Sequence, residues 1–292
     1  MKYAYYPGCS LHSTGEEFDK SLLAVCDKLG VELVEVEKWF CCGSTAAHNF
    51  SKLLATSLPM ANLALLDKMG LDEVVVPCAM CFSKFKIAQH NVKSDEKLRS
   101  DVLEVIQADC NDDAKVIHPL TIFAEEPLLS KIPTAVERDL SGLKVVCYYG
   151  CLLTRPPKIT QFDICEYPQT MDRVLRAAGI TTLDWTYKTD CCGASFALSK
   201  PDIVVELSHK IIENAKSAGA DAIAVACPMC HANLDTRQPD MEKTFDIESK
   251  MPILYFTQLM GYSFGISPEE LMVDKHLTDA ESIFEEVAQH AQ

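Results

Sequence analysis

The sequence contains no apolar run long enough to cross a lipid bilayer, and its first residues lack the apolar core of an export signal. Residues 1–7 are typical instead of a first β-strand. No block of lysine and arginine resembles a nucleic-acid-binding surface, and the net charge is −15, from 27 basic and 42 acidic residues. We therefore expect a cytoplasmic protein with no direct membrane insertion and no nucleic acid partner.

The chain also lacks the C-x-x-C-x-x-C-x-x-x-C-P run that binds ferredoxin-type cubane clusters, so electrons would have to come from another protein or carrier. It nevertheless has 14 cysteines among 292 residues. Structural disulfides are rare in the cytoplasm, so this number favours metal binding or redox chemistry. The alternative, buried and inert thiols, is what we expect for the four cysteines outside the pattern described next: Cys26, Cys110, Cys147 and Cys165.

Ten of the cysteines form one five-cysteine pattern that occurs twice. Each copy has a single cysteine, an adjacent pair followed by glycine, and a Cys-x-x-Cys motif. The gaps are 31, 35 and 2 residues in the first copy, and 39, 34 and 2 in the second. The repeat indicates two soft-metal sites, with iron–sulfur clusters as the favoured interpretation. The first copy comprises Cys9, Cys41, Cys42, Cys78 and Cys81, and the second Cys151, Cys191, Cys192, Cys227 and Cys230.

The two halves correspond beyond their cysteines. Residues 2–9 and 145–151 each form a predicted strand that ends in Gly-Cys, and a long amphipathic helix follows each Cys-Cys-Gly motif, at 51–69 and at 201–218. This alternation predicts an α/β fold of two pseudo-symmetric repeats of strand-helix units, with mainly parallel sheets and one Cys-Cys-Gly motif in each repeat.

The patterned cysteines all come at or just after the C-terminal end of a predicted strand. Ligands collect at this edge in open parallel sheets, so the placement favours one metal site in each half. Prolines and charged residues cluster between residues 128 and 142, where we place the boundary between the halves. We therefore predict an N-terminal domain over residues 1–135 and a C-terminal domain over residues 136–292.

The spacing of the cysteines restricts the metal. Cys-x-x-Cys lets two thiolates bind one metal, or two neighbouring metals, from a tight turn. Adjacent cysteines can both reach one cluster, and the glycines that follow, Gly43 and Gly193, permit the positive φ that such a turn can require. Each half offers five thiolates where a cubane 4Fe-4S cluster uses four, which indicates an unusual cluster or a mobile thiolate.

Zinc is the rival metal, but its structural sites often use two Cys-x-x-Cys motifs and each half has only one.

The repeated pattern resembles that of the CCG-domain proteins, and most closely that of the B-subunit of heterodisulfide reductase. The resemblance covers nearly the whole chain and is specific, since it includes residues around the cysteines. One departure is the gap after Cys192, which is one residue shorter than usual. The segments that carry the resemblance are Tyr-Tyr-Pro-Gly-Cys at 5–9, Trp-Phe-Cys-Cys-Gly at 39–43, Pro-Cys-Ala-Met-Cys at 77–81, Tyr-Gly-Cys at 149–151, Asp-Cys-Cys-Gly at 190–193 and Cys-Pro-Met-Cys at 227–230.

The resemblance implies two noncubane 4Fe-4S clusters, each bound by the five cysteines of one copy. It implies that the disulfide of coenzyme M and coenzyme B binds between the clusters, that each cluster takes one sulfur, and that two electrons and two protons release two thiols. This is the disulfide reductase activity of methanogenesis, in which each cluster supplies one electron. The implied partners are a ferredoxin-type subunit and a flavoprotein subunit of the same complex.

A substrate with sulfonate, phosphate and carboxylate groups requires cations in its pocket. Lys84 and Lys86 follow the first Cys-x-x-Cys motif, and Arg155 and Lys158 follow the single cysteine of the second half. Arginine suits bidentate contacts with oxyanions, so these four residues are candidate substrate-binding residues. The alternative for each is an ordinary solvated charge.

Two histidines close to patterned cysteines are candidate proton donors to a departing thiolate. His12 follows Cys9 by three residues, and His231 directly follows Cys230. The alternative for both is a surface position or a supporting position near the cluster.

Other functions remain open at this point. The chain could be an electron-transfer subunit of another CCG-domain dehydrogenase, of the glycolate or lactate oxidation type, or a reductase of a different disulfide. A third interpretation is a zinc-stabilised assembly protein with no redox role, for which the cysteines would bind zinc in place of iron.

Overall fold

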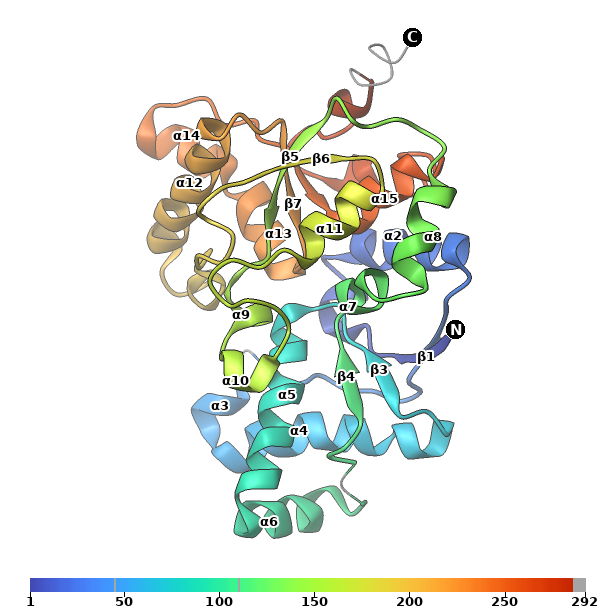
Figure 1. The fold of residues 1–292 in the computed structure, drawn as a ribbon. Coiled ribbons are helices and arrows are strands. Elements are labelled where there is room, and N and C mark those ends of the chain that lie inside the picture. The colour runs from blue at the N-terminus through green and yellow to red at the C-terminus, as the bar shows by residue number, and fades with distance from the viewer. Residues whose placement is uncertain (45, 110, 286–292) are drawn as a thin grey trace.

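The computed structural model describes residues 1–44, 46–109 and 111–285. It contains two four-stranded sheets whose strand orders are β2-β1-β3-β4 and β6-β5-β7-β8, with every pairing parallel. The predicted α/β fold of two repeats with parallel sheets is therefore confirmed (Figure 1). Cys110, which we expected to be an inert thiol, lies outside the described residues.

Helices connect the strands in the same order in both halves. The first half contains β1 (Lys2–Tyr5), α1 (Gly8–Leu11), α2 (Glu16–Leu29), β2 (Glu32–Glu35), α3 (Ala47–Phe50), α4 (Lys52–Ala64), the 3-10 helix η1 (Leu66–Met69), β3 (Glu73–Val75), α5 (Ala79–Ser94), α6 (Glu96–Ile106), β4 (Lys115–Ile117), α7 (Pro119–Ala124) and α8 (Leu128–Ala135). The second half contains β5 (Lys144–Tyr148), α9 (Cys151–Thr154), α10 (Pro157–Thr160), α11 (Thr170–Ala177), β6 (Thr181–Leu183), η2 (Ala194–Phe196), α12 (Pro201–Ser217), β7 (Ala222–Val225), α13 (Pro228–Thr236), α14 (Gln238–Phe245), β8 (Ile253–Tyr255), α15 (Phe256–Ser263) and η3 (Val273–Lys275).

The structure differs from the sequence prediction in two sets of helices. The helix expected over residues 51–69 is divided, because α4 ends at Ala64 and η1 completes the segment before Gly70, which has a φ of 62°. The helices α5 and α13 begin inside the Cys-x-x-Cys motifs and were not predicted. Both are buried around much of their circumference, so neither shows a strongly one-sided apolar pattern in the sequence.

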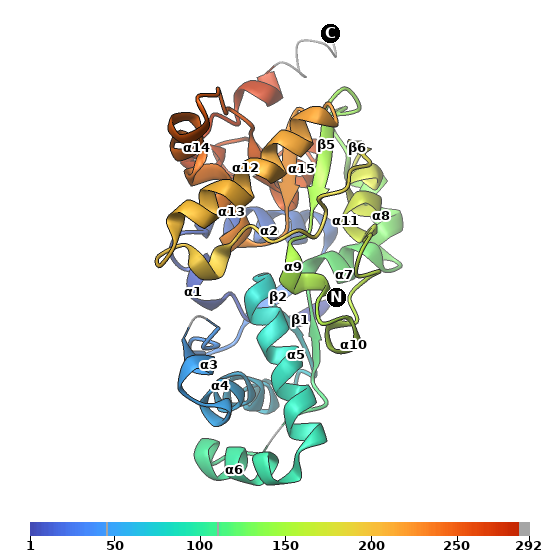
Figure 2. The ribbon, with the colours of Figure 1, turned by 90° about the vertical axis from the view of Figure 1, so that its left-hand side faces the viewer.

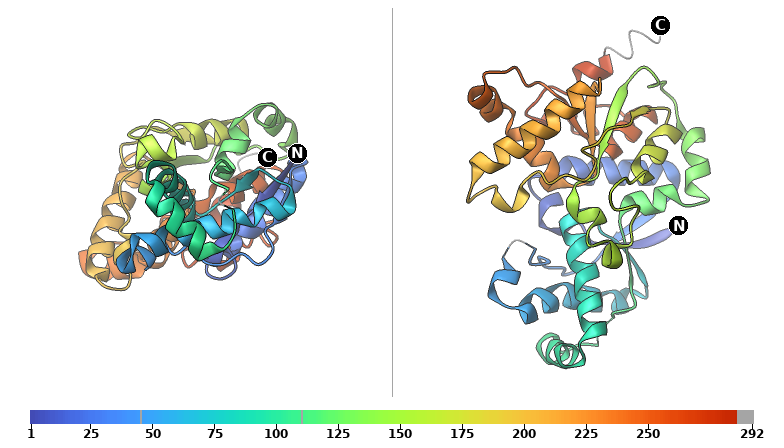
Figure 3. Two further views of the ribbon diagram at one scale, coloured as in Figure 1. Left: turned by 90° about the horizontal axis from the view of Figure 1, so that it is seen from below. Right: turned by 60° about the vertical axis from the view of Figure 1, so that its left-hand side comes forward.

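Each half packs one of its helices against the other half, and the two exchanged helices occupy equivalent places in the repeat. Helix α2, which joins β1 to β2, packs against α15 of the second half, and its counterpart α11, which joins β5 to β6, packs against α7 of the first half. Figures 1 and 2 show α2 and α8 beside the helices of the second half. The right-hand view in Figure 3 shows the first-half helices α4, α5 and α6 gathered at the other end of the molecule.

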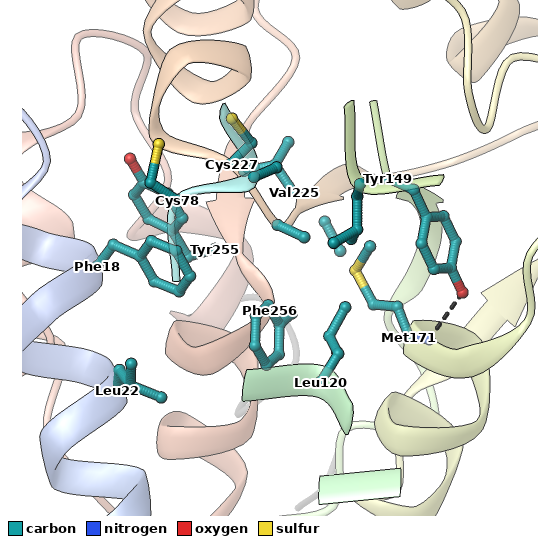
Figure 4. Packing of buried hydrophobic residues seen from close by; sticks show 14 of the residues in the cluster. Phe18, Leu22, Cys78, Leu120, Tyr149, Met171, Val225, Cys227, Tyr255 and Phe256 are labelled. Carbon is teal, nitrogen blue, oxygen red and sulfur yellow. Dashed lines mark hydrogen bonds between the residues drawn. The ribbon is translucent and has the colours of Figure 1, made fainter. Parts of the chain in front are cut away.

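This exchange produces one apolar core shared by both halves. Figure 4 shows Phe18 of α2 and Leu120 of α7 beside Phe256 of α15 and Met171 of α11, and all four side chains are buried. Burial of a large apolar side chain contributes about 1.5–3 kcal/mol, so each half depends on the other for part of its stability. The division into domains over residues 1–135 and 136–292 stays a prediction.

His118 links the two halves at the centre of the molecule. It follows β4 and is fully buried. Its Nε2 lies 2.9 Å from the carbonyl oxygen of Pro77 and 3.2 Å from that of Ala226, and its Nδ1 accepts a hydrogen bond from the N–H of Leu120. Nε2 therefore carries the proton and donates to both carbonyls. Pro77 and Ala226 directly precede the two Cys-x-x-Cys motifs, so one imidazole connects both.

Among the described residues, no helix combines the length and the apolar character that crossing a membrane requires.

We predict that His118 makes the stability of the protein dependent on pH. Burial lowers the pKa of His118 from 6.5 to about 4. Between these values the unfolded chain binds a proton that the folded chain does not, so the free energy of unfolding falls as the pH drops through this window and is constant above it. The expected loss approaches about 3 kcal/mol.

Urea unfolding between pH 4 and pH 8 checks this prediction. His118→Gln should reduce the slope, because glutamine does not titrate, and the slope that remains should come from groups such as His231 and His276, whose pKa values burial also lowers. His90→Gln, a change of an exposed histidine, serves as the control and should keep the slope of the unaltered protein. An unchanged slope in His118→Gln would show that other groups cause the dependence.

Candidate metal centre

The ten patterned cysteines lie at the C-terminal edges of the two sheets, as predicted. Cys9 lies in the short helix α1, which follows β1, and Cys151 begins the short helix α9, which follows β5. Each adjacent pair of cysteines comes after β2 or β6. The Cys-x-x-Cys motifs follow β3 and β7 and open α5 and α13. The strand order brings these ends together. In each sheet the two central strands, β1 and β3 or β5 and β7, are neighbours, and the chain runs from them to strands on opposite sides of the sheet.

Burial is graded in the same way in both sets. The outer members are exposed or half-buried: Cys9, Cys41, Cys151 and Cys191. The inner members are buried: Cys42, Cys78, Cys81, Cys192, Cys227 and Cys230. Each half thus presents three buried thiols beneath two thiols that solvent can reach.

Sulfur contacts within each set repeat the symmetry. The Sγ atoms of Cys42 and Cys81 are 3.1 Å apart, and those of Cys192 and Cys230 are 3.7 Å apart. The two sets also meet, because Cys78 and Cys227 lie close enough across the halves to shift each other's pKa. Figure 4 shows these two side chains at the top of the shared core. The two groups of thiols are therefore neighbours.

The thiols shift one another's acidity. Hydrogen bonds from Cys41 and then Cys81 lower the pKa of Cys42 to about 3, and one from Cys151 lowers the pKa of Cys191 to about 6. Hydrogen bonds from Cys230 and Cys78 lower the pKa of Cys227 as well. Each set thus favours at least one thiolate, which is the form that binds metals. A donor set made of thiolates alone suits soft metals and iron–sulfur clusters.

The glycines in the turns allow the backbone to approach the thiols closely. Gly43 and Gly193 have φ values of 74° and 80°, as the sequence analysis anticipated, and their N–H groups donate to the Sγ atoms of Cys41 and Cys191 at 3.4 and 3.3 Å. At Gly150, which has a φ of 69°, a Cβ would lie 2.8 Å from the Sγ of Cys230. This position leaves no room for a side chain.

Two tyrosines hold the Cys-Cys-Gly loops from equivalent positions. The hydroxyl of Tyr6 donates to the carbonyl of Phe40 at 2.8 Å, and that of Tyr148 donates to the carbonyl of Asp190 at 2.6 Å. Both carbonyls belong to the residue that precedes a cysteine pair. The phenols therefore fix the loops that carry the pairs.

A cleft between the halves leads to the cysteines. A cavity of about 80 Å³ lies against the second set of cysteines, and a larger one of about 400 Å³ opens beside it. Four residues line both cavities, and two of them, Met80 and Met229, are the equivalent methionines of the two Cys-x-x-Cys motifs. The residues lining the larger cavity are Ser44, His48, Asn49, Met80, Ala194, Ser195, Ala197, Leu198, Ser199 and Met229.

The candidate substrate-binding cations lie outside the described lining of these two cavities. Arg155 is half-buried, and its Nη1 donates to the carbonyl of Thr189 at 2.8 Å. Lys158 is exposed, and Lys84 is half-buried on α5. Lys86 lies with its Nζ 5.8 Å from the centre of the Phe82 ring. A substrate role for these four residues stays a prediction.

The two candidate proton donors occupy different environments. His12 is exposed, and its Nε2 is 3.3 Å from a carboxylate oxygen of Glu35. His231 is buried, its Nε2 lies 3.1 Å from the carbonyl of Ile253, and burial lowers its pKa well below the usual value. Neither belongs to the described lining of the cavities, and their role as proton donors stays a prediction.

Sequence reasoning missed several residues of the cleft. Met80 and Met229 occupy the same place in the repeated motif, so the repeat itself could have drawn attention to them. His48 and Leu198 had no such signal, because they lie in segments whose path depends on the fold.

A buried ion pair supports the second set of cysteines. The Nζ of Lys188 lies 2.8 Å from a carboxylate oxygen of Asp172, and both side chains are 0% exposed. The hydroxyl of Tyr149 donates to the other oxygen of Asp172 at 2.7 Å. Tyr149 lines the smaller cavity two residues before Cys151. This network therefore fixes the start of α9.

The fold and the site define a class of protein: a duplicated α/β chain in which each half gathers five cysteines at the edge of a parallel sheet. A comparison with protein families assigns the class more closely. The chain matches the CCG family, described as "Cysteine-rich domain", over residues 3–86 and 145–235. The chain belongs to this family, which confirms the resemblance that the sequence indicated.

Two curated relatives match the chain over nearly its full length. The 8-methylmenaquinol:fumarate reductase membrane anchor subunit of Wolinella succinogenes is 28% identical over 96% of this chain and 98% of that protein. The B-subunit of the ferredoxin/F(420)H(2)-dependent CoB-CoM heterodisulfide reductase of Methanosarcina acetivorans is 28% identical over 94% of this chain and 93% of that protein. The chain is thus similar to subunits of two different reductases.

A solved structure shares the fold. A hypothetical protein from Helicobacter pylori superimposes with a TM-score of 0.76 at 11% identity, over 96% of this chain and 52% of that chain.

We predict that Lys188→Met destabilises the protein by about 3–5 kcal/mol, because it leaves the buried carboxylate of Asp172 without its ionic partner. Urea unfolding provides the measurement. Lys115→Met is the matched control: Lys115 pairs with Glu73 at 2.8 Å, but both side chains are at least 38% exposed. This change should cost no more than about 1 kcal/mol. Equal losses for the two variants would contradict the prediction.

Proposed function

We propose that the protein is the catalytic iron–sulfur subunit of a heterodisulfide reductase, which cleaves the disulfide of coenzyme M and coenzyme B to two thiols. The observation that carries the proposal is the meeting of two equivalent five-cysteine sets across the halves, with Cys78 and Cys227 as neighbours and a cleft beside the second set. Such a geometry can present one redox centre to each sulfur of a disulfide.

The residues present fit two iron–sulfur clusters. Each set offers thiolates alone, and a cavity of about 80 Å³ lies against the second set. We propose two 4Fe-4S clusters of the noncubane type, each of which supplies one electron at a time. The first would be held by Cys9, Cys41, Cys42, Cys78 and Cys81, and the second by Cys151, Cys191, Cys192, Cys227 and Cys230.

The chain's own residues would position the substrate and control access to it. The overall reaction takes up two electrons and two protons, breaks one S–S bond and forms two thiols. Met80 and Met229 provide polarisable, apolar walls beside the sulfurs. Cys191, which lines the smaller cavity and is exposed, would face the cleft side of the second cluster. His12 and His231 remain the proposed proton donors, and Arg155, Lys158, Lys84 and Lys86 the proposed contacts for the anionic groups.

We further propose a complex in the cytoplasm in which a ferredoxin-type subunit delivers electrons from a flavoprotein subunit. The similarity to a subunit of a heterodisulfide reductase supports a multisubunit assembly. The absence of a ferredoxin-type cysteine run from this sequence agrees with an external electron donor.

A second candidate function is electron transfer within a different CCG-domain reductase. The similarity to the membrane anchor subunit of a quinol:fumarate reductase favours it, since the two chains correspond over almost their full lengths. Two large apolar side chains near the cleft also face solvent: Leu198 is 99% exposed and Phe50 is 79% exposed. An apolar rim suits an apolar electron donor or a hydrophobic partner surface.

The content of iron and sulfide, with the EPR response to ligands, separates the candidates. Anaerobically purified protein should contain about eight irons per chain, and coenzyme M under oxidising conditions should alter its EPR signal. Iron with a response only to a menaquinol analogue would favour the second candidate. Zinc in place of iron would overturn both.

We predict that Gly150→Ala removes the second cluster. The added Cβ would lie 2.8 Å from the Sγ of Cys230, and a positive φ adds strain. Iron should fall from about eight to about four per chain. Gly30→Ala is the matched control, because Gly30 has an almost equal φ of 71° and no neighbour within 4 Å of an added Cβ. Full iron in both variants would refute the assigned ligand geometry.

A further inference from the structure

A buried asparagine contacts the second cysteine pair from a neighbouring helix. Asn233 lies on α13, three residues after Cys230, so both residues are on the same face of that helix. The Nδ2 of Asn233 donates a hydrogen bond to the carbonyl oxygen of Cys192 at 3.1 Å, and it lies 3.6 Å from the Sγ of the same cysteine. One amide thus contacts both the backbone and the sulfur of a patterned cysteine.

The contact with the carbonyl determines which end of the amide faces the sulfur. A carbonyl oxygen only accepts hydrogen bonds, so the nitrogen of the Asn233 amide, and not its oxygen, must face the carbonyl of Cys192. An amide nitrogen carries two hydrogens. One of them bonds to the carbonyl oxygen, and the other is available to the sulfur of Cys192.

The contact lies in the interior of the protein. Asn233 is 4% exposed and Cys192 is 2% exposed. Burial of an amide costs free energy unless its hydrogen bonds are made, and a hydrogen bond is electrostatically stronger in the interior than in water. A donor to the sulfur of Cys192 at this depth therefore acts with little competition from solvent.

The first half has a different residue at the equivalent position. The repeat aligns Cys81 with Cys230, so the residue three places further on is Lys84 in the first half and Asn233 in the second. Lys84 is half-buried, and its ammonium group ends a long, flexible chain. The short, neutral amide at this position of the repeat is therefore specific to the second half.

We propose that the amide of Asn233 donates a hydrogen bond to the sulfur of Cys192 when the second set of cysteines holds its iron–sulfur cluster, and that this bond raises the reduction potential of that cluster. The inference rests on the proposed function in that it requires the clusters, although it holds for either candidate reductase. Asn233 is thus a positioning residue that acts through its ligand, Cys192.

The direction of the effect follows from charge. Reduction increases the negative charge on the ligand sulfurs, so a donor to one of them stabilises the reduced state more than the oxidised state. Loss of the donor should therefore make the midpoint potential more negative. Since Asn233 contacts a sulfur of the second set, the shift should fall on the second cluster. The residue would thereby distinguish the two one-electron centres of the proposed reaction.

The test is a redox titration with dithionite, followed by EPR, on anaerobic protein that contains its iron. Asn233→Leu replaces the amide with an apolar side chain of similar size, and the midpoint potential of the second cluster should become more negative while that of the first stays nearly constant. The EPR signal that Cys230→Ser abolishes identifies the second cluster.

Gln89→Leu is the matched control. Gln89 is also a buried amide, but its Nε2 donates to the carbonyl oxygens of Asp112 and Ala114, at 3.1 and 2.7 Å. Loss of this amide should leave both midpoint potentials unchanged. A general disturbance caused by removing any buried amide would shift the potentials in both variants.

A measurement on the unaltered protein guards against loss of iron in Asn233→Leu. Asparagine labelled with ¹⁵N in its side-chain amide should give an isotropic nitrogen coupling in the pulsed EPR spectrum of the second cluster, because a hydrogen bond transfers spin density from the sulfur. Absence of this coupling, or full iron in Asn233→Leu with an unchanged second potential, would overturn this inference and leave the proposed function intact. Unaltered protein without iron would overturn the proposed function and this inference with it.

Discussion

The contact between the two Cys-x-x-Cys motifs constrains the rest of the structure. Cys78 and Cys227 come from different halves, yet their thiols are neighbours at the centre of the molecule and shift each other's pKa. Bringing two strand ends this close requires both sheets to direct the same edge inward. His118 maintains the arrangement, because it donates to the carbonyl before each motif and is completely buried. The exchange of helices between the halves surrounds this junction with apolar side chains and keeps water from it.

Equivalent halves do not imply equivalent sites. The position before Gly-Cys is Pro7 in the first half and Tyr149 in the second. Only Tyr149 can donate to a buried carboxylate, and it joins the ion pair of Lys188 and Asp172. The fixed dipoles near the second set of cysteines therefore differ from those near the first, which gives the two sets different electrostatic surroundings.

The sequence predicted the parts of the structure that a local pattern encodes. The cysteines, the glycines with positive φ after each pair and the parallel strands all follow from a repeat that can be read directly. Helices α5 and α13 were missed because burial around most of their surface removes the one-sided pattern. The junction was missed for a different reason: Tyr255 and Phe18 are far apart in the chain, and nothing local indicates that their rings stack. The cleft residues His48 and Leu198 likewise depend on how two segments meet.

The exchange of helices also has an evolutionary consequence. In each half, the helix after the first strand packs against the helix after the fourth strand of the other half. A single half on its own would leave both of these surfaces exposed, and two identical copies could cover them by the same pairings. The arrangement is therefore that of a symmetric dimer whose two members became joined in one chain, after which each copy was free to change on its own.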